Sequence, residues 1–363
     1  MDSRMKTADA AIYLLRCMVH YETPDEKVLD QIDMDELFKF GEFHKINACL
    51  GYALRNSHVD NRWSEAMNKA IYRTMMFDNE RKKITDFMNE SGIWYCCLKG
   101  LVLQHYYPEY GIREFSDNDI LFDSSFEKQV HDYFVGTGYK VKSYGIGHHD
   151  EYMKKPFFNF EMHTKLFDAV SGDLVCDYYK NEHDKLQHNG TKMELVFSNE
   201  DFYIYYIAHA FKHFSEGGTG IRTLLDINLY TQSNELNYEY VSNQLGEIGL
   251  KDKESIMRSL SAKLFDINST LSNAEINMLK KIVSSGAYGT IENRVSEEIE
   301  KKGNVAKYII SRLFPDETIV KVYYPYAYKY KVLYPVMWIH RIIKAVTISR
   351  KKVLSEFKAI NSD

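Results

Sequence analysis

The chain has 363 residues, of which 45% are apolar and 27% charged, the balance of a globular protein that buries a sizeable core. Its formal net charge is −5, which excludes a protein whose whole surface attracts nucleic acid by charge. Five cysteines occur without a Cys-x-x-Cys pair, so we expect free thiols and a reducing, cytoplasmic setting. The chain lacks an apolar leader and any run of about 18 apolar residues, so neither a signal peptide nor a membrane span is predicted.

The first part of the chain, residues 1–90, is expected to be a helical N-terminal region. Apolar residues recur at helical spacing among good helix formers. This pattern predicts helices over residues 8–20, 34–46 and 64–89. Ser91-Gly92 ends the last of them.

Between residues 91 and 197 the pattern changes to short strands mixed with helices. Apolar runs predict strands at 93–98 and 117–122, a helix at 125–136 and a strand at 139–143. Residues 157–166 alternate polar and apolar side chains, as in a strand with one buried face. Because no βαβ repeat is present, we expect an α+β fold rather than a doubly wound sheet.

Residues 198–363 are expected to form a helical C-terminal lobe. Ser198 is predicted to cap a helix over 199–214, because Glu200 and Asp201 follow it in the first turn. A new helix is predicted to start near Arg222. Further helices are predicted at 237–247, 252–265, 272–284, 293–301, 304–313 and, as one basic helix, 336–358.

The central chemical signal is Asp117-Asn118-Asp119 at the start of an apolar strand. Strand alternation places both carboxylates on one face, with their Cα atoms roughly 7 Å apart. That separation suits two Mg²⁺ ions about 3.5–4 Å apart, which neutralise a triphosphate and activate an attacking oxygen. Taken alone, such a pair is more commonly two surface acids that cap a strand.

Three neighbouring features favour the metal interpretation. Lys99 and Gly100 lie between the preceding strand and a short helix, where backbone amides and a cation can hold phosphate. Arg113 lies four residues before Asp117 and can reach the same phosphates with two hydrogen bonds. Glu161 lies on the polar face of the alternating strand, where a third carboxylate completes a metal site.

These residues belong to an ordered set of motifs over about residues 93–230. The set is Leu98-Lys99-Gly100, Arg113, Asp117-Asn118-Asp119-Ile120-Leu121, Glu161-Met162-His163, His209-Ala210-Phe211-Lys212-His213, Gly218-Thr219-Gly220-Ile221-Arg222 and Asp226. In order, spacing and strand context, it resembles the uncharacterised nucleotidyltransferase family, which belongs to the polymerase β-like superfamily.

The resemblance implies a small mixed β-sheet with helices behind it, two Mg²⁺ ions (Mn²⁺ can fill the same role) and a nucleoside triphosphate such as ATP. It implies that Asp117 and Asp119 bind both ions. Glu161 would be the third ligand or would help to deprotonate the acceptor. A nucleoside monophosphate would then pass to an acceptor hydroxyl, with release of pyrophosphate.

The turn before the acids departs from the superfamily pattern. Most members have Gly-Ser there, and the serine touches the triphosphate. Here Lys99-Gly100 occupies the corresponding turn, and the gap from Gly100 to Asp117 is long. We therefore expect Lys99 to supply the phosphate contact, with Gly100 and Arg113 beside it and His163, His209, His213 and Arg222 lining the same cleft.

Two histidines of the set have helical spacing. His209 and His213 lie four residues apart, a spacing that can bind zinc, but Ala210 replaces the glutamate of His-Glu-x-x-His. We expect the pair to line the cleft beside Arg222 or to pack as hydrogen-bonded structure.

Two glycine-rich stretches have open roles. The glycines within residues 217–220 either end one helix or present backbone amides to an anion. His148 and His149 follow another glycine-rich stretch. A plain loop is expected there, with a position flanking the site as the alternative.

The end of the chain is basic. From Lys321 to Lys352 there are eight Lys or Arg residues and no acid. Helical spacing of the interleaved apolar residues predicts that this tail packs on the protein itself. The alternatives are contact with RNA or with an anionic membrane surface. The interleaved apolar residues are Val336, Ile339, Ile342, Ile343 and Val346.

We therefore expect a Mg²⁺-dependent nucleotidyltransferase whose acceptor is a small molecule, RNA or a protein. The alternative hypothesis is a catalytically silent nucleotidyltransferase fold that serves as a binding or scaffolding module. The unusual Lys99-Gly100 turn motivates that alternative.

Overall fold

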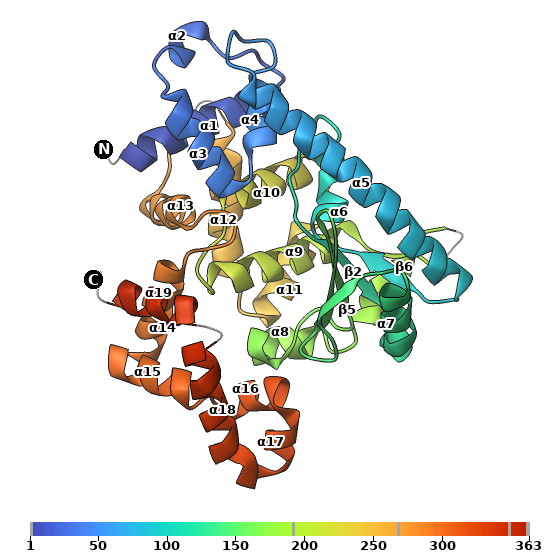
Figure 1. Ribbon diagram of the computed structural model, residues 1–363. Coiled ribbons are helices and arrows are strands. Elements are labelled where there is room, and N and C mark those ends of the chain that lie inside the picture. Colours follow the sequence, from blue (N-terminus) through green and yellow to red (C-terminus); the bar gives the residue numbers. More distant parts are fainter. Residues whose placement is uncertain (1–2, 191–192, 267–268, 348–349, 361–363) are drawn as a thin grey trace.

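The computed structural model describes residues 3–190, 193–266, 269–347 and 350–360. Helices from both ends of the chain flank one five-stranded mixed sheet formed by its middle part (Figure 1). This arrangement confirms the expected α+β fold with a small mixed sheet.

The N-terminal region is helical, as predicted. Its helices are α1 (Ser3–Val19), α2 (Glu26–Leu29), α3 (Met34–His44), α4 (Asn47–Ala53) and α5 (Arg62–Glu90). Three of them, α1, α3 and α5, match the predicted segments. Helix α4 was not predicted, because all seven of its residues are buried and it therefore lacks the one-sided apolar stripe that marks an amphipathic helix.

The sheet has the strand order β1-β2-β5-β4-β3. Strands β2 and β5 pair in parallel, and the other neighbours pair antiparallel. Four strands were predicted, but β4 was not. Strand β4 begins at His149, so the loop expected at that residue is wrong. It was not predicted because its first residues, His149, Asp150 and Glu151, are all polar and show no alternation with apolar residues. The strands are β1 (Tyr95–Cys97), β2 (Asn118–Phe122), β3 (Lys140–Ser143), β4 (His149–Lys154) and β5 (Phe158–His163).

One face of the sheet packs against α5 and α7 (Glu127–Gly136). Phe77 from α5, Phe134 from α7 and Phe160 from β5 meet there, fully buried. Asn118 also points to this side, since its Oδ1 accepts a hydrogen bond from Arg81 on α5 at 2.8 Å. Because side chains alternate along a strand, Asp119 points to the opposite face.

The opposite side of the molecule is formed by the C-terminal lobe. Ser198 caps α9 as predicted, because its Oγ accepts a hydrogen bond from the Asp201 N–H at 3.0 Å. Its first helices are α9 (Asn199–Phe214), α10 (Ile221–Ser233), α11 (Tyr238–Glu247), α12 (Lys251–Leu264) and α13 (Asn273–Ser285). The middle part of the chain also contains α6 (Gly100–Leu103), α8 (Asp173–Tyr178), β6 (Leu186–His188) and β7 (Leu195–Phe197).

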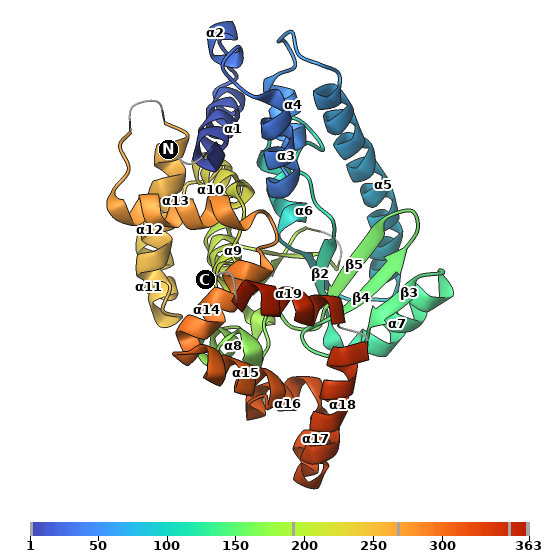
Figure 2. The same ribbon diagram turned by 60° about the vertical axis from the view of Figure 1, so that its left-hand side comes forward.

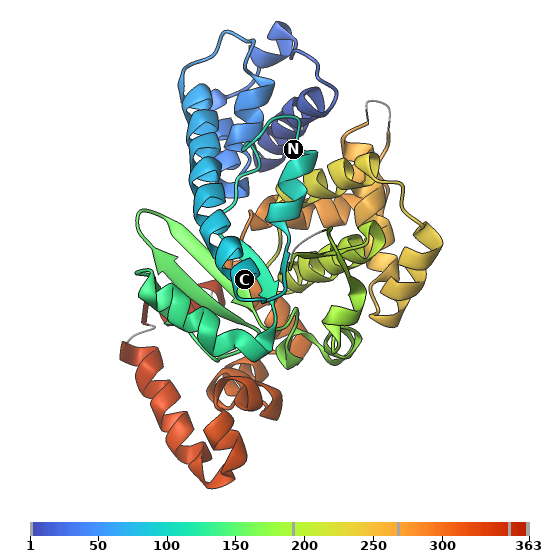
Figure 3. The same ribbon diagram turned by 90° about the vertical axis from the view of Figure 1, so that its right-hand side faces the viewer.

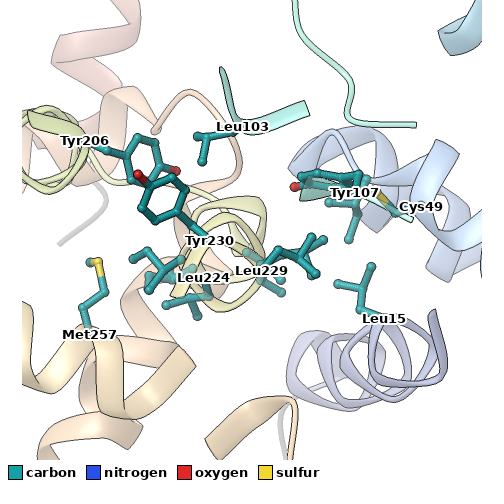
Figure 4. Packing of buried hydrophobic residues seen from close by; sticks show 14 of the residues in the cluster. Leu15, Cys49, Leu103, Tyr107, Tyr206, Leu224, Leu229, Tyr230 and Met257 are labelled. Carbon is teal, nitrogen blue, oxygen red and sulfur yellow. The ribbon is translucent and has the colours of Figure 1, made fainter. Parts of the chain in front are cut away.

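The largest hydrophobic core joins the two ends of the sequence. Leu15 from α1 and Cys49 from α4 pack in the same cluster as Leu224 and Leu229 from α10 and Met257 from α12 (Figure 4). The N-terminal helices and the C-terminal lobe therefore support each other. The boundaries at residues 90 and 197 stay a prediction.

In its described residues, the last part of the chain forms six α-helices. The predicted single helix over 336–358 is wrong, because α18 and α19 run in different directions (Figure 2); residues 348 and 349 of the prediction lie outside the described residues. Helices α16, α17 and α18 project from the body of the molecule (Figures 2 and 3). The helices are α14 (Ile291–Lys302), α15 (Val305–Leu313), α16 (Glu317–Tyr323), α17 (Pro325–Lys329), α18 (Tyr334–Thr347) and α19 (Arg350–Ile360).

The expected internal packing of this tail is wrong for α18. Its side chains Val336, Ile339 and Ile343 are 63%, 59% and 56% exposed, and Ile342 is exposed too. Only the other face of the helix is covered, where Met337 packs with α16 and α17. The side chain of Val346 lies outside the described residues. Within the described ranges, no helix is long and apolar enough to cross a membrane.

Candidate active site

Two neighbouring parallel strands bring the predicted acids together. In the β2–β5 ladder, Asp119 is the direct partner of Glu161, so the two side chains project from the same face of the sheet. Asp117 lies one residue before β2. All three carboxylates line one cavity of about 230 Å³.

Most of the predicted site residues line that cavity, which we call the acidic cavity. His163 is not among its lining residues but contacts Asp119 from β5, through its Nε2 at 2.9 Å from Oδ1. The predicted residues that line the cavity are Lys99, Gly100, Arg113, Asp117, Asp119, Glu161, His209, His213 and Arg222.

Lys99 forms an ion pair with the central acid. Its Nζ lies 2.5 Å from Oδ1 of Asp119, and both side chains are largely buried. Burial alone would raise the pKa of Asp119. The charge of Lys99 and the hydrogen bond from His163 outweigh that effect and hold the pKa of Asp119 well below its usual range. Asp119 is therefore ionised without a metal.

Among the described residues, neither Asp117 nor Glu161 forms an ion pair with a lysine or arginine. Burial, and then the negative charge of Asp119, raises the pKa of Glu161 well above its usual range. The same two causes raise the pKa of Asp117. Three carboxylates thus share one cavity with one close lysine, an excess of negative charge that divalent cations would neutralise.

A histidine completes the possible ligand set. Ligand atoms of Asp119, Glu161 and His163 all lie within 4.8 Å of one another. A second group within the same limit is His148, His149 and His163. Burial lowers the pKa of His163 to about 4 despite its hydrogen bond to Asp119, so its imidazole is neutral. Carboxylates suit Mg²⁺ and Mn²⁺, and a neutral imidazole also suits Mn²⁺ and Zn²⁺.

Arg113 is held by an acid of the C-terminal lobe. Its Nε and Nη2 donate to the two carboxylate oxygens of Asp226, each at 2.8 Å. The hydroxyls of Tyr107 and Tyr206 donate to the same carboxylate at 2.7 and 2.9 Å. This buried network links the loop before Asp117 to α10. Phosphate contact by Arg113 stays a prediction.

The third nitrogen of Arg113 explains the glycine of the Lys99-Gly100 turn. A Cβ atom at Gly100 would lie 2.5 Å from Nη1 of Arg113, closer than real atoms approach. Lys99 itself has a positive φ of 46°, a conformation that is uncommon for residues other than glycine. The turn is therefore shaped by packing around the guanidinium.

The two histidines of α9 contact each other. Nε2 of His213 lies 3.1 Å from Nε2 of His209. Among the described residues, neither belongs to a group of three potential metal ligands within 4.8 Å. The pair lines the acidic cavity together with Arg222. This agrees with the predicted cleft position rather than with a zinc site.

The glycine loop before α10 is tightly packed. A Cβ atom at Gly218 would lie 1.9 Å from Oγ of Ser285, and φ is 108° there. The first backbone amide of α10, at Ile221, donates to Nδ1 of His44 at 3.2 Å. Close packing thus accounts for the glycine, and this amide already has an acceptor.

Some residues of the site were not predicted. Tyr107 and Tyr206 hold Asp226, and Ser116 and Tyr288 line the acidic cavity. Nothing in their local sequence marks them, because a chain with 28 tyrosines offers no reason to single out these three. Ser116 directly precedes Asp117, so adjacency was the one available signal.

One comparison with known proteins identifies the family of this chain. The sequence profile of a family described as "Uncharacterised nucleotidyltransferase" matches residues 30–266. No curated protein matches the chain. Among solved structures, the lincomycin-bound lincosamide antibiotic adenylyltransferase LnuA is similar, with 15% identity and a TM-score of 0.31, over 43% of this chain and 97% of that chain. The family profile covers more than half of the chain and includes Asp117, Asp119 and Glu161, so the protein belongs to the uncharacterised nucleotidyltransferase family and is a transferase enzyme by class.

Proposed function

We propose that this protein transfers a nucleoside monophosphate from a nucleoside triphosphate to an acceptor hydroxyl, with Mg²⁺ as the resident cation. The observation that carries the proposal is the pairing of Asp119 with Glu161 across parallel strands, with Asp117 in the same cavity. Among the described residues, this cavity brings together the three acids at β2 and β5 with two cations that can contact phosphate, Lys99 and Arg222.

The donor set fits divalent cations. Asp117, Asp119 and Glu161 would hold two Mg²⁺ ions, and Mn²⁺ can take the same place. When bound, such ions neutralise the triphosphate and favour ionisation of an attacking hydroxyl. The raised pKa values of Asp117 and Glu161 support this fit, because a carboxylate that is costly to ionise alone is stabilised by a cation.

In the proposed reaction the chain binds and orients both reactants. Lys99 and Arg222 contact the phosphates, and Glu161 accepts the proton of the acceptor hydroxyl. The acceptor oxygen forms a bond to the α-phosphorus. The bond from that phosphorus to the oxygen bridging the β-phosphorus breaks, and pyrophosphate leaves. His163 keeps Asp119 oriented through its 2.9 Å hydrogen bond.

The test is transfer of label. Purified protein would be incubated with each of the four α-labelled nucleoside triphosphates, Mg²⁺ and fractionated cell extract. We expect one fraction to gain label with wild type and with Asp132→Asn, an exposed acid on α7 that pairs with Lys128. Asp119→Asn should abolish the gain. Label that appears equally with Asp119→Asn would refute the proposal.

One observation favours the second candidate, a silent binding module. Lys99 already neutralises Asp119 at 2.5 Å, so the cavity has a counter-ion of its own for one acid. This candidate expects nucleotide binding that needs no divalent cation, together with no label transfer to any fraction. Binding in excess EDTA that equals binding in Mg²⁺ would favour it over transfer.

We also propose that the basic tail contacts an anionic membrane surface rather than RNA. The exposed apolar face of α18 suits burial among lipid headgroups, and cations such as Lys329 and Lys344 flank it. Amphipathic helices of this kind bind anionic membranes by apolar burial and charge together. RNA binding without vesicle binding is the outcome that would select the other partner.

A further inference from the structure

A second hollow adjoins the acidic cavity. It has a volume of about 560 Å³ and lies among α3, α5 and the loop before Asp117. We call it the basic groove, because five cations line it against three acids. The cations are Lys45, Arg62, Lys69, Arg73 and Arg222, and the acids are Glu42, Glu65 and Glu114.

The two hollows are neighbours that share part of their lining. Phe115, Ser116, Arg222 and Tyr288 line both of them. At about 230 Å³, the acidic cavity is smaller than the roughly 300–1,000 Å³ that a small-molecule site occupies. The acidic cavity therefore has room for the phosphates of the donor at its acids but not for a second reactant as well. The groove is the adjoining space of sufficient size.

Most of the groove cations have no acid as a partner. Arg62 pairs with Asp35 and Asp60. In the part of the chain that the structure describes, Lys45, Lys69, Arg73 and Arg222 form no ion pair within 4.0 Å.

Among these cations, Arg73 has a side chain that is held in place for binding an anion in the groove. Its guanidinium carbon lies 4.9 Å from the centre of the Phe157 ring, which fixes the side chain against the sheet. Its Nε is buried and has no hydrogen-bond partner among the described residues. Because the described residues supply no acid to this guanidinium, which lines the groove, a phosphate in the groove can pair with its charge.

We propose that the basic groove binds a phosphate group of the acceptor, so that the acceptor of this enzyme is a phosphate-bearing molecule. The proposal rests on the proposed function, which places the triphosphate of the donor at Asp117 and Asp119. The groove is then left to the second reactant. Arg73 and Lys69 hold the phosphate of the acceptor, and Arg222 lies where the two hollows join.

The test uses a pair of probes that differ in one phosphate. Binding of ribose 5-phosphate and of ribose to the full chain would be measured by calorimetry. We expect wild type to bind ribose 5-phosphate in preference to ribose. Arg73→Ala and Lys69→Glu should each weaken binding of ribose 5-phosphate at least about tenfold, the order expected when one charge-assisted hydrogen bond is lost. Lys82→Ala, an exposed α5 lysine paired with Asp86 outside the groove, should change it less than twofold.

Two controls keep the result interpretable. Loss of packing on Phe157 could unfold Arg73→Ala, but Lys69 is exposed and its charge reversal tests the groove without that risk. Binding of ATP with Mg²⁺ would be measured on the same variants. We expect it to change less than twofold, because the donor lies in the acidic cavity.

Each outcome bears on one claim. Unchanged ribose 5-phosphate binding in Lys69→Glu and Arg73→Ala would overturn the groove proposal and leave the proposed function standing. Weakened ATP binding in those variants, with unchanged sugar phosphate binding, would assign the groove to the donor and overturn the acceptor proposal. ATP binding that is insensitive to Asp119→Asn would instead count against the proposed function.

Discussion

Asp119 and Glu161 are direct partners in the parallel ladder between β2 and β5, although 42 residues separate them in the sequence. This pairing places a carboxylate with a strongly lowered pKa beside one with a strongly raised pKa. Lys99 and His163 cause the difference, because both contact Asp119, whereas burial raises the pKa of Glu161. The sheet register thus places the two acids side by side, and their contacts with Lys99 and His163 give them different pKa values.

The buried Arg113–Asp226 pair should dominate the stability of the site. Asp226→Asn removes the charge that compensates Arg113 in a fully buried setting. We expect a loss of ~3–5 kcal/mol in the free energy of unfolding, the usual effect of breaking a buried ion pair. Urea unfolding followed by circular dichroism measures it. Asp132→Asn on the surface of α7 should stay within about 0.5 kcal/mol, and a similarly small effect of Asp226→Asn would show that the pair is dispensable.

Gly100 should resist substitution because of Arg113. In Gly100→Ala the new Cβ meets Nη1 of a guanidinium that Asp226 fixes at two points. We expect a destabilisation of about 1–3 kcal/mol, as for overpacking, together with weaker ATP binding. Gly136→Ala is the matched control, since its Cβ would meet nothing within 4 Å. Equal melting temperatures for the two variants would contradict the assigned cause.

Glu275 should make part of the stability dependent on pH. Burial opposes ionisation, but hydrogen bonds from Ser259, the Ser272 N–H and Lys263 outweigh it and lower the pKa of Glu275 to about 2. A lowered pKa in the folded state adds stability above the usual value of 4.5, and this stability is lost as pH falls toward 2. The difference in unfolding free energy between wild type and Glu275→Gln should therefore be full at pH 6 and should shrink below about pH 4.5.

A surface acid provides the comparison for that experiment. Glu36→Gln removes an exposed partner of Lys39 and should change the unfolding free energy by less than about 0.5 kcal/mol at every pH. If the gap for Glu275→Gln were constant from pH 6 to pH 3, the hydrogen bonds to Glu275 would not act through its charge.

The tail should bind anionic vesicles. We expect co-sedimentation with phosphatidylcholine vesicles that contain phosphatidylserine, and little with phosphatidylcholine alone, because binding needs charge as well as apolar burial. Ile339→Ser and Ile343→Ser should weaken it, and Val141→Ser, at an exposed site on β3, should not. Added salt should weaken it as charges are screened. Equal binding to both vesicle types would contradict an electrostatic contribution.

The sequence carried enough information for the fold class and for the position of the acids. Strand alternation in 157–166 put Glu161 on a polar face, and the apolar run after Asp119 marked β2. Helix α9 was predicted at its observed bounds, because Ser198 and the first-turn acids mark its start. These features are local, so periodicity and capping chemistry reveal them.

Long-range partners could not be predicted in the same way. Arg113 was assigned to phosphate from its distance to Asp117 in the sequence, yet Asp226 holds it from 113 residues away. The exposed face of α18 was expected to be buried, because helical spacing shows that a face is apolar without showing what covers it. Strand β4 was missed because three polar residues begin it. Pairing with β5 decides its structure.

The central claim is tested most directly by nucleotide binding to wild type and Asp119→Asn, with the unfolding free energy of both measured alongside. ATP affinity would be determined by calorimetry in Mg²⁺ and again in excess EDTA. We predict that wild type binds ATP only with Mg²⁺ and that Asp119→Asn weakens this binding at least about tenfold, the effect of losing ~1.4 kcal/mol. Glu161→Gln, which leaves the Lys99 pair intact, should also weaken it. An ATP affinity that is the same in EDTA, or unchanged in folded Asp119→Asn, would contradict a metal-dependent nucleotidyl transfer site at these acids.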